Sequence, residues 1–429
     1  MLRWAAVAQT WTIEKLVPGG DGFLRLEDGR AAFAPGTAPG DRILVQAFEE
    51  RRGYVRATEW ELLSPGPERA EPPCPITGTC GGCDLMHLTH PAQLAAKRGM
   101  LVEAIERIAK VTPAPVAPGV IAAGSSLGYR ARARLHVTRA GELGFRARGS
   151  HRVVTLSHCP VCSDAINAAI GWLQRAPAAI RRELREAEVR EDLGGGPVLL
   201  RLVTHRQPST RLREWTKLAP DSFVVHLTGT TPPSRHRFPL PGGLHLVVSD
   251  SSFTQVNWAV NHTLIEHVLG GVRERGLRTF CELYCGCGNF TLPLLDAGLR
   301  GHAVERDADA IEAARAGASE AQLPAETFEA SDVGQAVRDL VQRNARFELI
   351  LLDPPREGAK DIVGALHRIC TSTLVICSCD PTTLARDART LQQSGFTLQK
   401  VVGFDMFPQT HHLEAVAWFG RDPATTPDT

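Results

Sequence analysis

The stretch FCELYCGCGNF, residues 280–290, decides how the last third of the chain is interpreted. It is an apolar run that enters a turn with two glycines, and we expect a helix to begin near Phe290. Glycine at positions 286 and 288 lets the backbone approach a ligand at the N-terminus of that helix. The spacing is not the G-x-G-x-x-G of dinucleotide-binding proteins, so the turn alone is weak evidence for any one ligand.

Similar apolar runs alternate with helical patterns after about residue 257. They lie at 279–284, 301–304, 348–352, 373–378, 397–404 and 413–419. This alternation is typical of a parallel sheet covered by helices on both faces. We therefore predict a nucleotide-binding type of α/β domain for the last third of the chain.

Two acidic residues follow the glycine turn at positions suited to a nucleoside. Glu305 ends the run GHAVE, where a carboxylate can bind both ribose hydroxyls of an adenosine. Asp332, in the turn SDV, is placed to meet the adenine. The combination favours S-adenosylmethionine over NAD; the alternative is an ordinary strand, turn and helix with a surface Glu305.

The motif LILLDPPREG (349–358) places Asp353 at the carboxyl end of a buried strand, where open α/β sheets bind ligands. Methyltransferases that act on nucleic-acid bases share Asp-Pro-Pro at this position, including those that methylate amino groups. The motif therefore narrows the substrate class and leaves the reaction open.

The segment LVICSCDPTTLARD (374–387) ends a strand at Cys379 and begins a helix at Asp380. A helix N-terminus can lower the pKa of a thiol and favour the nucleophilic thiolate. Cys379 is therefore the candidate nucleophile, whereas Cys377, two residues earlier, is predicted to be a core residue.

The last motif, DMFPQTHHLEAVAWF (405–419), places Glu414 at the start of an apolar strand. A carboxylate is costly there unless it is solvated or has a function. His411 and His412 precede it. Because adjacent side chains of an extended chain point apart, we interpret them as loop or substrate contacts rather than metal ligands.

A cysteine-rich stretch, CPITGTCGGC, brings Cys74, Cys80 and Cys83 close together. Three thiolates at this spacing can bind one metal or cluster, and SHCPVCS supplies the remaining ligand as Cys159 or Cys162. Spacing alone leaves zinc and an iron–sulfur cluster equally open.

The rest of the chain divides into strand-rich and mixed regions. Short alternating runs between residues 11 and 63 predict about five strands in a small antiparallel barrel of the oligonucleotide-binding type. Residues 91–110 have the apolar spacing of one amphipathic helix. Strand-like segments at 127–157, 197–204, 222–228 and 244–249, with helical runs near 165–190, predict a mixed and mostly antiparallel unit.

Within that unit, residues 128–152 contain seven arginines and one glutamate. Arg130, Arg132, Arg134 and His136 alternate with apolar residues, which on a strand gives one basic and one apolar face. Since a solvated sheet face usually mixes charges of both signs, we interpret this one as a phosphate-binding surface.

Composition limits the class of protein. Hydrophobic residues make up 43% of the 429-residue chain and charged residues 22%, which is typical of globular proteins. With a net charge of +1, any nucleic-acid surface must be local. The absence of a long apolar run and of a signal-peptide pattern favours a cytoplasmic protein with reduced thiols, so we do not expect the eleven cysteines to form disulfides.

Together these motifs resemble the RNA (uracil-5-)-methyltransferases that form 5-methyluridine, in the branch with a TRAM domain and a [4Fe-4S] cluster. The matching motifs span nearly the whole chain in the family's order: C-x5-C-G-G-C, YRxRARL, GFR, a CP pair, FTQVN (253–257), LYCGCGNFTLP, VER, LLDPPREG, SCDPTTLARD and DMFPQTHHLE.

The resemblance implies three domains. They are an OB-like TRAM barrel at 8–66, a central mixed α+β, RNA-binding domain with the iron–sulfur cluster at 67–250, and a Rossmann-like class I methyltransferase domain at 251–429. It also implies that helix 91–112 packs with the C-terminal domain.

The resemblance assigns roles to particular residues. Cys379 resembles the nucleophile and Glu414 the general base. The implied cluster ligands are Cys74, Cys80, Cys83 and Cys159, with Cys162 as a second possible distal ligand. The implied contacts to S-adenosylmethionine are Gln255, Tyr284, Asn289, Glu305, Asp332 and Asp353. The chain departs from the family's commoner form at Asp380, where asparagine is usual.

The implied reaction transfers a methyl group from S-adenosylmethionine to carbon 5 of a uridine in ribosomal or transfer RNA, with a Cys379 adduct at carbon 6. RNA is the expected partner, with no membrane and no obligate protein partner. Two other classes stay open: an amino-group methyltransferase acting on a base, which needs no covalent thiol, and a non-catalytic RNA-binding protein with a metal-stabilised fold.

Overall fold

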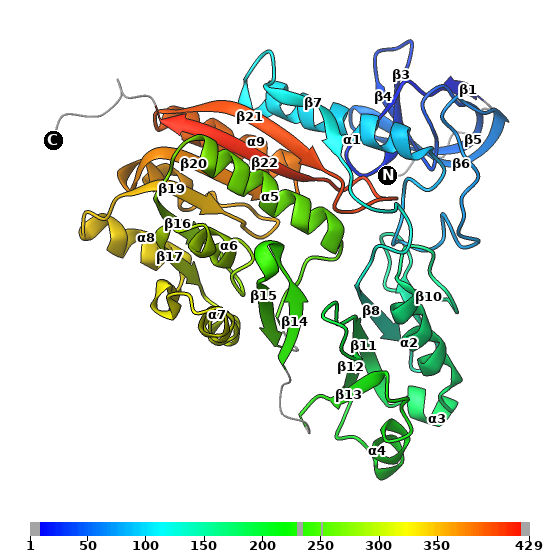
Figure 1. The fold of residues 1–429 in the computed structure, drawn as a ribbon. Helices are drawn as coiled ribbons and strands as arrows, with labels where there is room; N and C mark the ends of the chain where they lie inside the picture. The colour runs from blue at the N-terminus through cyan, green and yellow to red at the C-terminus, as the bar shows by residue number, and fades with distance from the viewer. Residues whose placement is uncertain (1–8, 230–234, 250–251, 422–429) are drawn as a thin grey trace.

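The computed structural model describes residues 9–229, 235–249 and 252–421. Residues 8, 250, 251 and 429, which bound the predicted domains, lie outside these ranges. Figure 1 shows strands of the N-terminal region, a central group of strands and helices, and a larger C-terminal group around a long sheet. No helix in these ranges is long and apolar enough to cross a membrane.

The N-terminal region is a sheet of six strands in the order β1-β5-β6-β4-β3-β2. Its core consists of inward-facing residues such as Ile43, Val45 and Val55, which alternate with exposed residues as a half-buried sheet requires. Sequence analysis predicted about five antiparallel strands; the structure has six, and β4 pairs with β6 in parallel. The strands are β1 (Gln9–Thr12), β2 (Lys15–Leu16), β3 (Asp21–Arg25), β4 (Ala31–Pro35), β5 (Arg42–Arg51) and β6 (Tyr54–Ser64).

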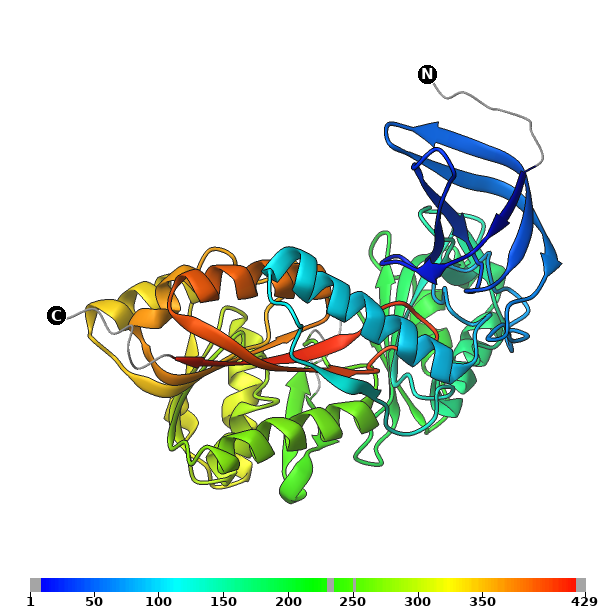
Figure 2. The same cartoon turned by 90° about the horizontal axis from the view of Figure 1, so that it is seen from above.

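Helix α1 (His90–Ala104) follows the cysteine-rich stretch and lies along the C-terminal sheet, as Figure 2 shows from above. It ends in one π-helical turn, η1 (Ile105–Ala109). Leu101 and Ile105 belong to the same buried cluster as Leu384 and Phe419 of the C-terminal sheet and its helices. Strand β7 (Val116–Ile121) then pairs in parallel with β21 at the edge of that sheet.

The central region is a second six-stranded sheet, in the order β10-β9-β8-β11-β12-β13. All neighbours are antiparallel except β12 and β13. Ile166, Ile170 and Leu173 of helix α2 pack against the apolar side of this sheet. The elements are β8 (Arg132–Val137), β9 (Leu143–Arg146), β10 (Val153–Thr155), α2 (Asp164–Arg175), α3 (Ala178–Arg181), β11 (Leu184–Arg190), β12 (Val198–Thr204), α4 (Thr210–Thr216) and β13 (Phe223–Leu227).

The prediction of helical runs near 165–190 is confirmed by α2 and α3 but was wrong for the last residues, because Leu184–Arg190 form β11, a central strand of this sheet. Its sequence LREAEVR alternates, so Ala187 and Val189 enter the core while Glu186 and Glu188 face the arginines of β8.

A hairpin of β14 (Arg235–Pro239) and β15 (His245–Ser249), joined by η2 (Pro241–Gly243), connects the central and C-terminal regions. Phe238, Leu246 and Val247 are buried in one cluster with Leu292 and Ala314 of the C-terminal helices. The hairpin is therefore packed into the C-terminal core.

The C-terminal sheet has eight strands in the order β18-β17-β16-β19-β20-β22-β21-β7. The predicted apolar runs are confirmed as strands, but the sheet is not wholly parallel, because β22 runs antiparallel to β20 and β21. A short loop joins β21 to β22, and such a connection reverses the chain. The strands are β16 (Thr279–Leu283), β17 (Arg300–Glu305), β18 (Phe328–Ala330), β19 (Phe347–Leu352), β20 (Cys370–Ser378), β21 (Phe396–Phe404) and β22 (Glu414–Arg421).

Helices cover both faces of this sheet, as the alternating pattern predicted. Helices α5, α6 and α7 bury one face, and α1, α8 and α9 bury the other. The elements not yet given are α5 (Trp258–Glu274), α6 (Thr291–Asp296), α7 (Ala308–Glu320), η3 (Ala325–Thr327), α8 (Val333–Gln342), η4 (Val363–Arg368) and α9 (Pro381–Gln393).

Candidate active site and cysteine cavity

Three chemically active side chains lie at one edge of the C-terminal sheet because each adjoins the end of a neighbouring strand. Asp353 directly follows β19, Cys379 directly follows β20, and Glu414 begins β22. Ser378 pairs with Ala415, so the same register continued by one residue sets Cys379 opposite Glu414. The fold therefore brings the candidate nucleophile and candidate base together although they are far apart in sequence.

The prediction that the helix after Cys379 lowers the pKa of its thiol was wrong. Burial raises the pKa of Cys379 to about 11, and the carboxylates of Glu414 and Asp353 add to this effect, with Arg356 opposing them. The first amides of α9 are occupied by Asp380, whose Oδ1 accepts hydrogen bonds from the N–H groups of Thr382 and Thr383 at 2.8 and 2.9 Å. The helix N-terminus is thus neutralised by its own cap.

Glu414 is only 4% exposed, and its Oε1 atom is buried without a hydrogen-bond partner among the described residues. Burial and the neighbouring Asp353 raise the pKa of Glu414 well above its usual range. Burial also raises the pKa of Asp353, to about 7. A buried carboxyl oxygen without a partner is costly, and open α/β sheets bind ligands at the carboxyl ends of their strands, so Glu414 is a candidate for proton exchange with a ligand.

His411 and His412 do not point apart as predicted. Their ring centroids are 4.1 Å apart, because the chain bends here instead of running extended. The Nδ1 atom of His411 contacts Oδ2 of Asp84 at 2.5 Å. Burial, His411 and Arg356 lower the pKa of His412 to about 4, so His412 is neutral at physiological pH and can serve as a hydrogen-bonding group.

The glycine turn lies at the same edge of the sheet, after β16. Glu305 holds this turn: its Oε2 accepts a hydrogen bond from the N–H of Gly286 at 3.3 Å, and its Oε1 accepts one from Asp307 at 3.0 Å. Tyr284 has a left-handed backbone with φ of 66°. Burial and the nearby charge of Asp332 raise the pKa of Tyr284 to about 12. Tyr284 therefore lies close enough to Asp332 and Glu305 for the charges of both acids to raise its pKa.

Two of the three remaining predicted cofactor contacts have structural partners of their own. The side chains of Asn289 and Asn261 exchange two hydrogen bonds, of 2.9 and 3.0 Å. Asp332 caps α8 by accepting a hydrogen bond from Gln335. Gln255 is half-buried in the irregular segment that precedes α5.

Glu282, which none of the predicted motifs included, is a buried acid on β16 beside this turn. It is 1% exposed, the Thr291 hydroxyl donates a hydrogen bond to it, and burial raises its pKa to about 8. The signal was an acid inside the apolar run FCEL, since such a residue is rarely buried without a role.

Four of the predicted metal-ligating cysteines line one cavity in the central region: Cys74, Cys80, Cys83 and Cys159. The charge of Cys159 helps to raise the pKa values of Cys80 and Cys83, after burial, which is the larger cause. In the described ranges, no three His, Cys, Asp or Glu side chains are grouped as a site for a metal ion.

Arg130 also lines this cavity, and its Nε atom is buried without a hydrogen-bond partner in the described part of the chain. Cys162 does not line the cavity; its S–H group donates to Cys159 and thereby lowers the pKa of the Cys159 thiol. The cavity thus contains four thiols and one cationic side chain.

The prediction that β8 has a face of unmixed positive charge was wrong for its arginines. Arg132 and Arg134 form ion pairs with Glu188 of β11 at 3.3 and 2.6 Å, and Arg201 of β12 joins them at 3.0 Å. Although burial opposes it, this cluster lowers the pKa of Glu188 to about 2. The neighbouring strand supplies the negative charge that the sequence of β8 lacks.

Comparison with known proteins identifies the family. A sequence model of tRNA (uracil-5-)-methyltransferases matches residues 243–422. The 23S rRNA (uracil(1939)-C(5))-methyltransferases RlmD of Pseudomonas putida and Pectobacterium atrosepticum are 34% and 32% identical to this chain. These alignments cover 96% of this chain and 93% and 94% of the relatives.

A solved structure shows the same fold. The crystal structure of Pyrococcus abyssi tRNA (uracil-54, C5)-methyltransferase with S-adenosyl-L-homocysteine matches with a TM-score of 0.72 at 24% identity. The match covers 96% of this chain and all of that one. With near full-length identity above 30% to curated relatives, this chain belongs to the RNA (uracil-5-)-methyltransferase family.

Proposed function

We propose that this protein methylates carbon 5 of a uridine in RNA, using S-adenosylmethionine as the methyl donor. The observation that carries the proposal is the meeting of Cys379, Glu414 and Asp353 at the ends of three adjacent strands. Ribosomal RNA is the favoured substrate class, because the full-length relatives are named as 23S rRNA enzymes.

Uracil carbon 5 is a weak nucleophile until a thiolate adds to carbon 6. In the proposed mechanism, Cys379 adds to carbon 6, and carbon 5 of the resulting enolate becomes methylated. Glu414 then removes the proton from carbon 5, and the electron pair released expels the Cys379 thiolate. The raised pKa of Glu414 makes its carboxylate a stronger base than an exposed glutamate.

S-Adenosylmethionine supplies the methyl group from its sulfonium. The residues proposed to hold it are Gln255, Tyr284, Asn289, Glu305, Asp332 and Asp353. The glycine turn supports this assignment at Gly286, where a Cβ would meet nothing within 4 Å, so the space beside the backbone is open. Position 288 requires glycine for packing, because a Cβ there, where φ is +92°, would meet Phe328 at 3.1 Å.

The proposed function predicts a specific product. Incubation with transcripts of 23S rRNA and of tRNA and with methyl-labelled S-adenosylmethionine should yield 5-methyluridine in one of the two RNAs. Nucleoside analysis distinguishes this product from a methylated amino group, which would instead support the alternative enzyme class. Absence of labelled product together with intact RNA binding would support a non-catalytic RNA-binding protein.

The cysteine cavity is proposed to hold a [4Fe-4S] cluster bound by Cys74, Cys80, Cys83 and Cys159. The cavity fits such a group because four cysteines line it and the buried Nε–H of Arg130, which has no partner in the described part of the chain, requires a hydrogen-bond acceptor. A cluster with four thiolate ligands supplies that acceptor. The role proposed for the cluster is structural, with the TRAM-like sheet and the central region binding the RNA.

The proposed cluster predicts different effects of substituting the two distal cysteines, Cys159 and Cys162. Protein purified without oxygen should be brown and contain iron and sulfide. Cys159→Ser should remove the cluster, because Cys159 lines the cavity, whereas Cys162→Ser should retain it. Iron and sulfide analysis of both variants provides the measurement, and stoichiometric zinc in the anaerobic protein would refute the cluster.

A further inference from the structure

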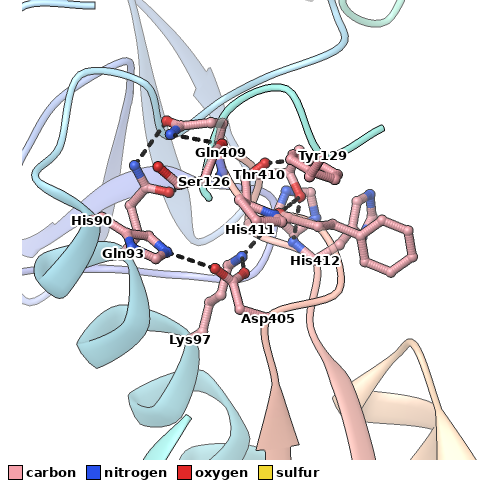
Figure 3. A network of polar contacts seen from close by, with 12 residues as sticks. His90, Gln93, Lys97, Ser126, Tyr129, Asp405, Gln409, Thr410, His411 and His412 are labelled. Carbon is pink, nitrogen blue, oxygen red and sulfur yellow. Dashed lines mark hydrogen bonds and ion pairs between the residues drawn. The ribbon is translucent and has the colours of Figure 1, made fainter. Parts of the chain in front are cut away.

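The segment that carries the candidate base is held by three parts of the chain. We call residues 405–413, between β21 and Glu414, the base loop. Figure 3 shows helix α1 and the segment around Ser126 and Tyr129 meeting this loop through polar contacts. The third part is Asp84 and Leu85, which directly follow Cys83 of the cysteine cavity.

Helix α1 fixes the start and the middle of the base loop. Lys97 and Asp405 form a fully buried ion pair, and Lys97 also donates a hydrogen bond to the carbonyl of Phe407 at 3.0 Å. Gln93 and Gln409 form a reciprocal pair: the Gln93 amide donates to Oε1 of Gln409, and Gln409 N–H donates to Oε1 of Gln93, both at 2.9 Å. These four side chains are buried, so their contacts with one another fix the loop.

Gln409 has a conformation that requires such support. Its φ is 69°, in the left-handed region that side chains other than glycine seldom adopt. Its carbonyl accepts hydrogen bonds from the N–H groups of Asp84 and Leu85 at 3.1 and 3.0 Å. Strained backbone persists only where the surroundings impose it, and here part of that restraint comes from the chain beside the cysteine cavity.

Asp84 also holds the end of the loop next to the base. Its Oδ1 accepts a hydrogen bond from the His411 N–H at 2.7 Å, and its Oδ2 contacts Nδ1 of the same residue at 2.5 Å. The ring of His411 lies against that of His412 at a tilt of 39°, and His412 immediately precedes Leu413 and Glu414. Asp84, which follows Cys83, therefore contacts His411 at two points, three positions before Glu414.

We propose that Asp84 and Leu85 position the base loop, and through it Glu414, so that the cysteine cavity sets the geometry of the base. Asp84 is then a positioning residue for proton removal from carbon 5. This inference rests on the proposed function and gives the cysteine cavity a specific structural role. Small displacements of a catalytic group lower kcat strongly, so loss of this contact reduces turnover without removing any reacting group.

The test uses Asp84→Ala in the full-length, metal-loaded protein. Amide hydrogen exchange of peptides covering the base loop should become about tenfold faster or more, because the loop loses its two side-chain anchors. kcat should fall by about tenfold or more, while KM for S-adenosylmethionine and the iron content stay at wild-type values. Asp84→Asn, which keeps one acceptor oxygen, should recover part of both effects.

Matched variants make the result specific. Glu103→Ala removes a surface partner of Lys15 from the same helix α1 and should leave the base loop protected. His411→Ala removes the partner from the loop side while keeping Asp84, and the double variant should behave like either single one if the contact is the cause. If Asp84→Ala does not fold, His411→Ala serves as the test variant in its place.

Three outcomes would overturn the proposal: unchanged exchange of the base loop in both Asp84→Ala and His411→Ala, loss of iron in parallel with the loss of turnover, or equal loosening in Glu103→Ala. Hydrogen exchange needs no catalysis. If wild-type protein makes no 5-methyluridine but the exchange results hold, the proposed function fails while the positioning contact stands.

Discussion

Cys379→Ala should form no methylated RNA while binding S-adenosylmethionine and RNA as the wild type does. The substitution removes the atom proposed to add to carbon 6, and without that addition carbon 5 does not become nucleophilic. Losing a covalent nucleophile costs about a thousandfold or more in rate. The measurement is single-turnover methyl transfer to RNA, alongside equilibrium binding of both substrates.

A second thiol on the same strand provides the control. Cys377→Ala removes sulfur two residues earlier on β20, where the side chain is buried in the core. This variant should lose some stability through the small cavity and keep most of its turnover. Turnover of Cys379→Ala within about tenfold of wild type would exclude the covalent mechanism and favour direct methylation of an amino group.

The raised pKa of Cys379 bears on how this thiol is activated. At about 11, its pKa leaves little thiolate at neutral pH. Asp380 occupies the helix N-terminus that could have lowered that pKa, and Glu414 and Asp353 raise it further. Asp353 and Glu414, whose pKa values are both raised, lie beside the thiol. Protonation of either acid therefore relieves the repulsion that a Cys379 thiolate would face.

The sequence was sufficient to predict where the candidate reacting groups lie, because their positions follow from strand ends. Apolar runs predicted the strands, and carboxyl ends of neighbouring strands meet at one edge of a sheet. Asp353, Cys379 and Glu414 were therefore found from the polar residues that flank those runs. The order of the strands, and hence the antiparallel insertion of β22, depends on contacts that no local pattern encodes.

Properties that depend on partners across space could not be predicted. The arginines of β8 looked like a free basic face because Glu188 lies on β11, more than fifty residues later in the chain. The same limit applies to the base loop, whose partners Gln93, Lys97 and Asp84 lie some three hundred positions earlier. The sequence alone does not indicate a buried ion pair such as that of Lys97 and Asp405, because the two residues meet only when helix α1 packs on the C-terminal sheet.

Glu414→Gln should trap the reaction after methyl transfer. Glutamine keeps the size of the side chain but cannot accept the proton from carbon 5, so Cys379 addition and methylation proceed while elimination stalls. The enzyme should accumulate as a covalent complex with methylated RNA. On a denaturing gel this complex is a slowly migrating band that carries the methyl label.

Two comparisons establish where Glu414 acts. The double variant Cys379→Ala/Glu414→Gln should give no band, since the covalent bond is to Cys379. Asp353→Asn tests the other acid with a raised pKa at the same edge of the sheet. Normal substrate binding by Glu414→Gln without labelled adduct would mean that Glu414 acts before proton removal or not at all. In that case, accumulation of the adduct in Asp353→Asn would transfer the role of base to Asp353, because its strand β19 ends beside β20 at the same edge of the sheet.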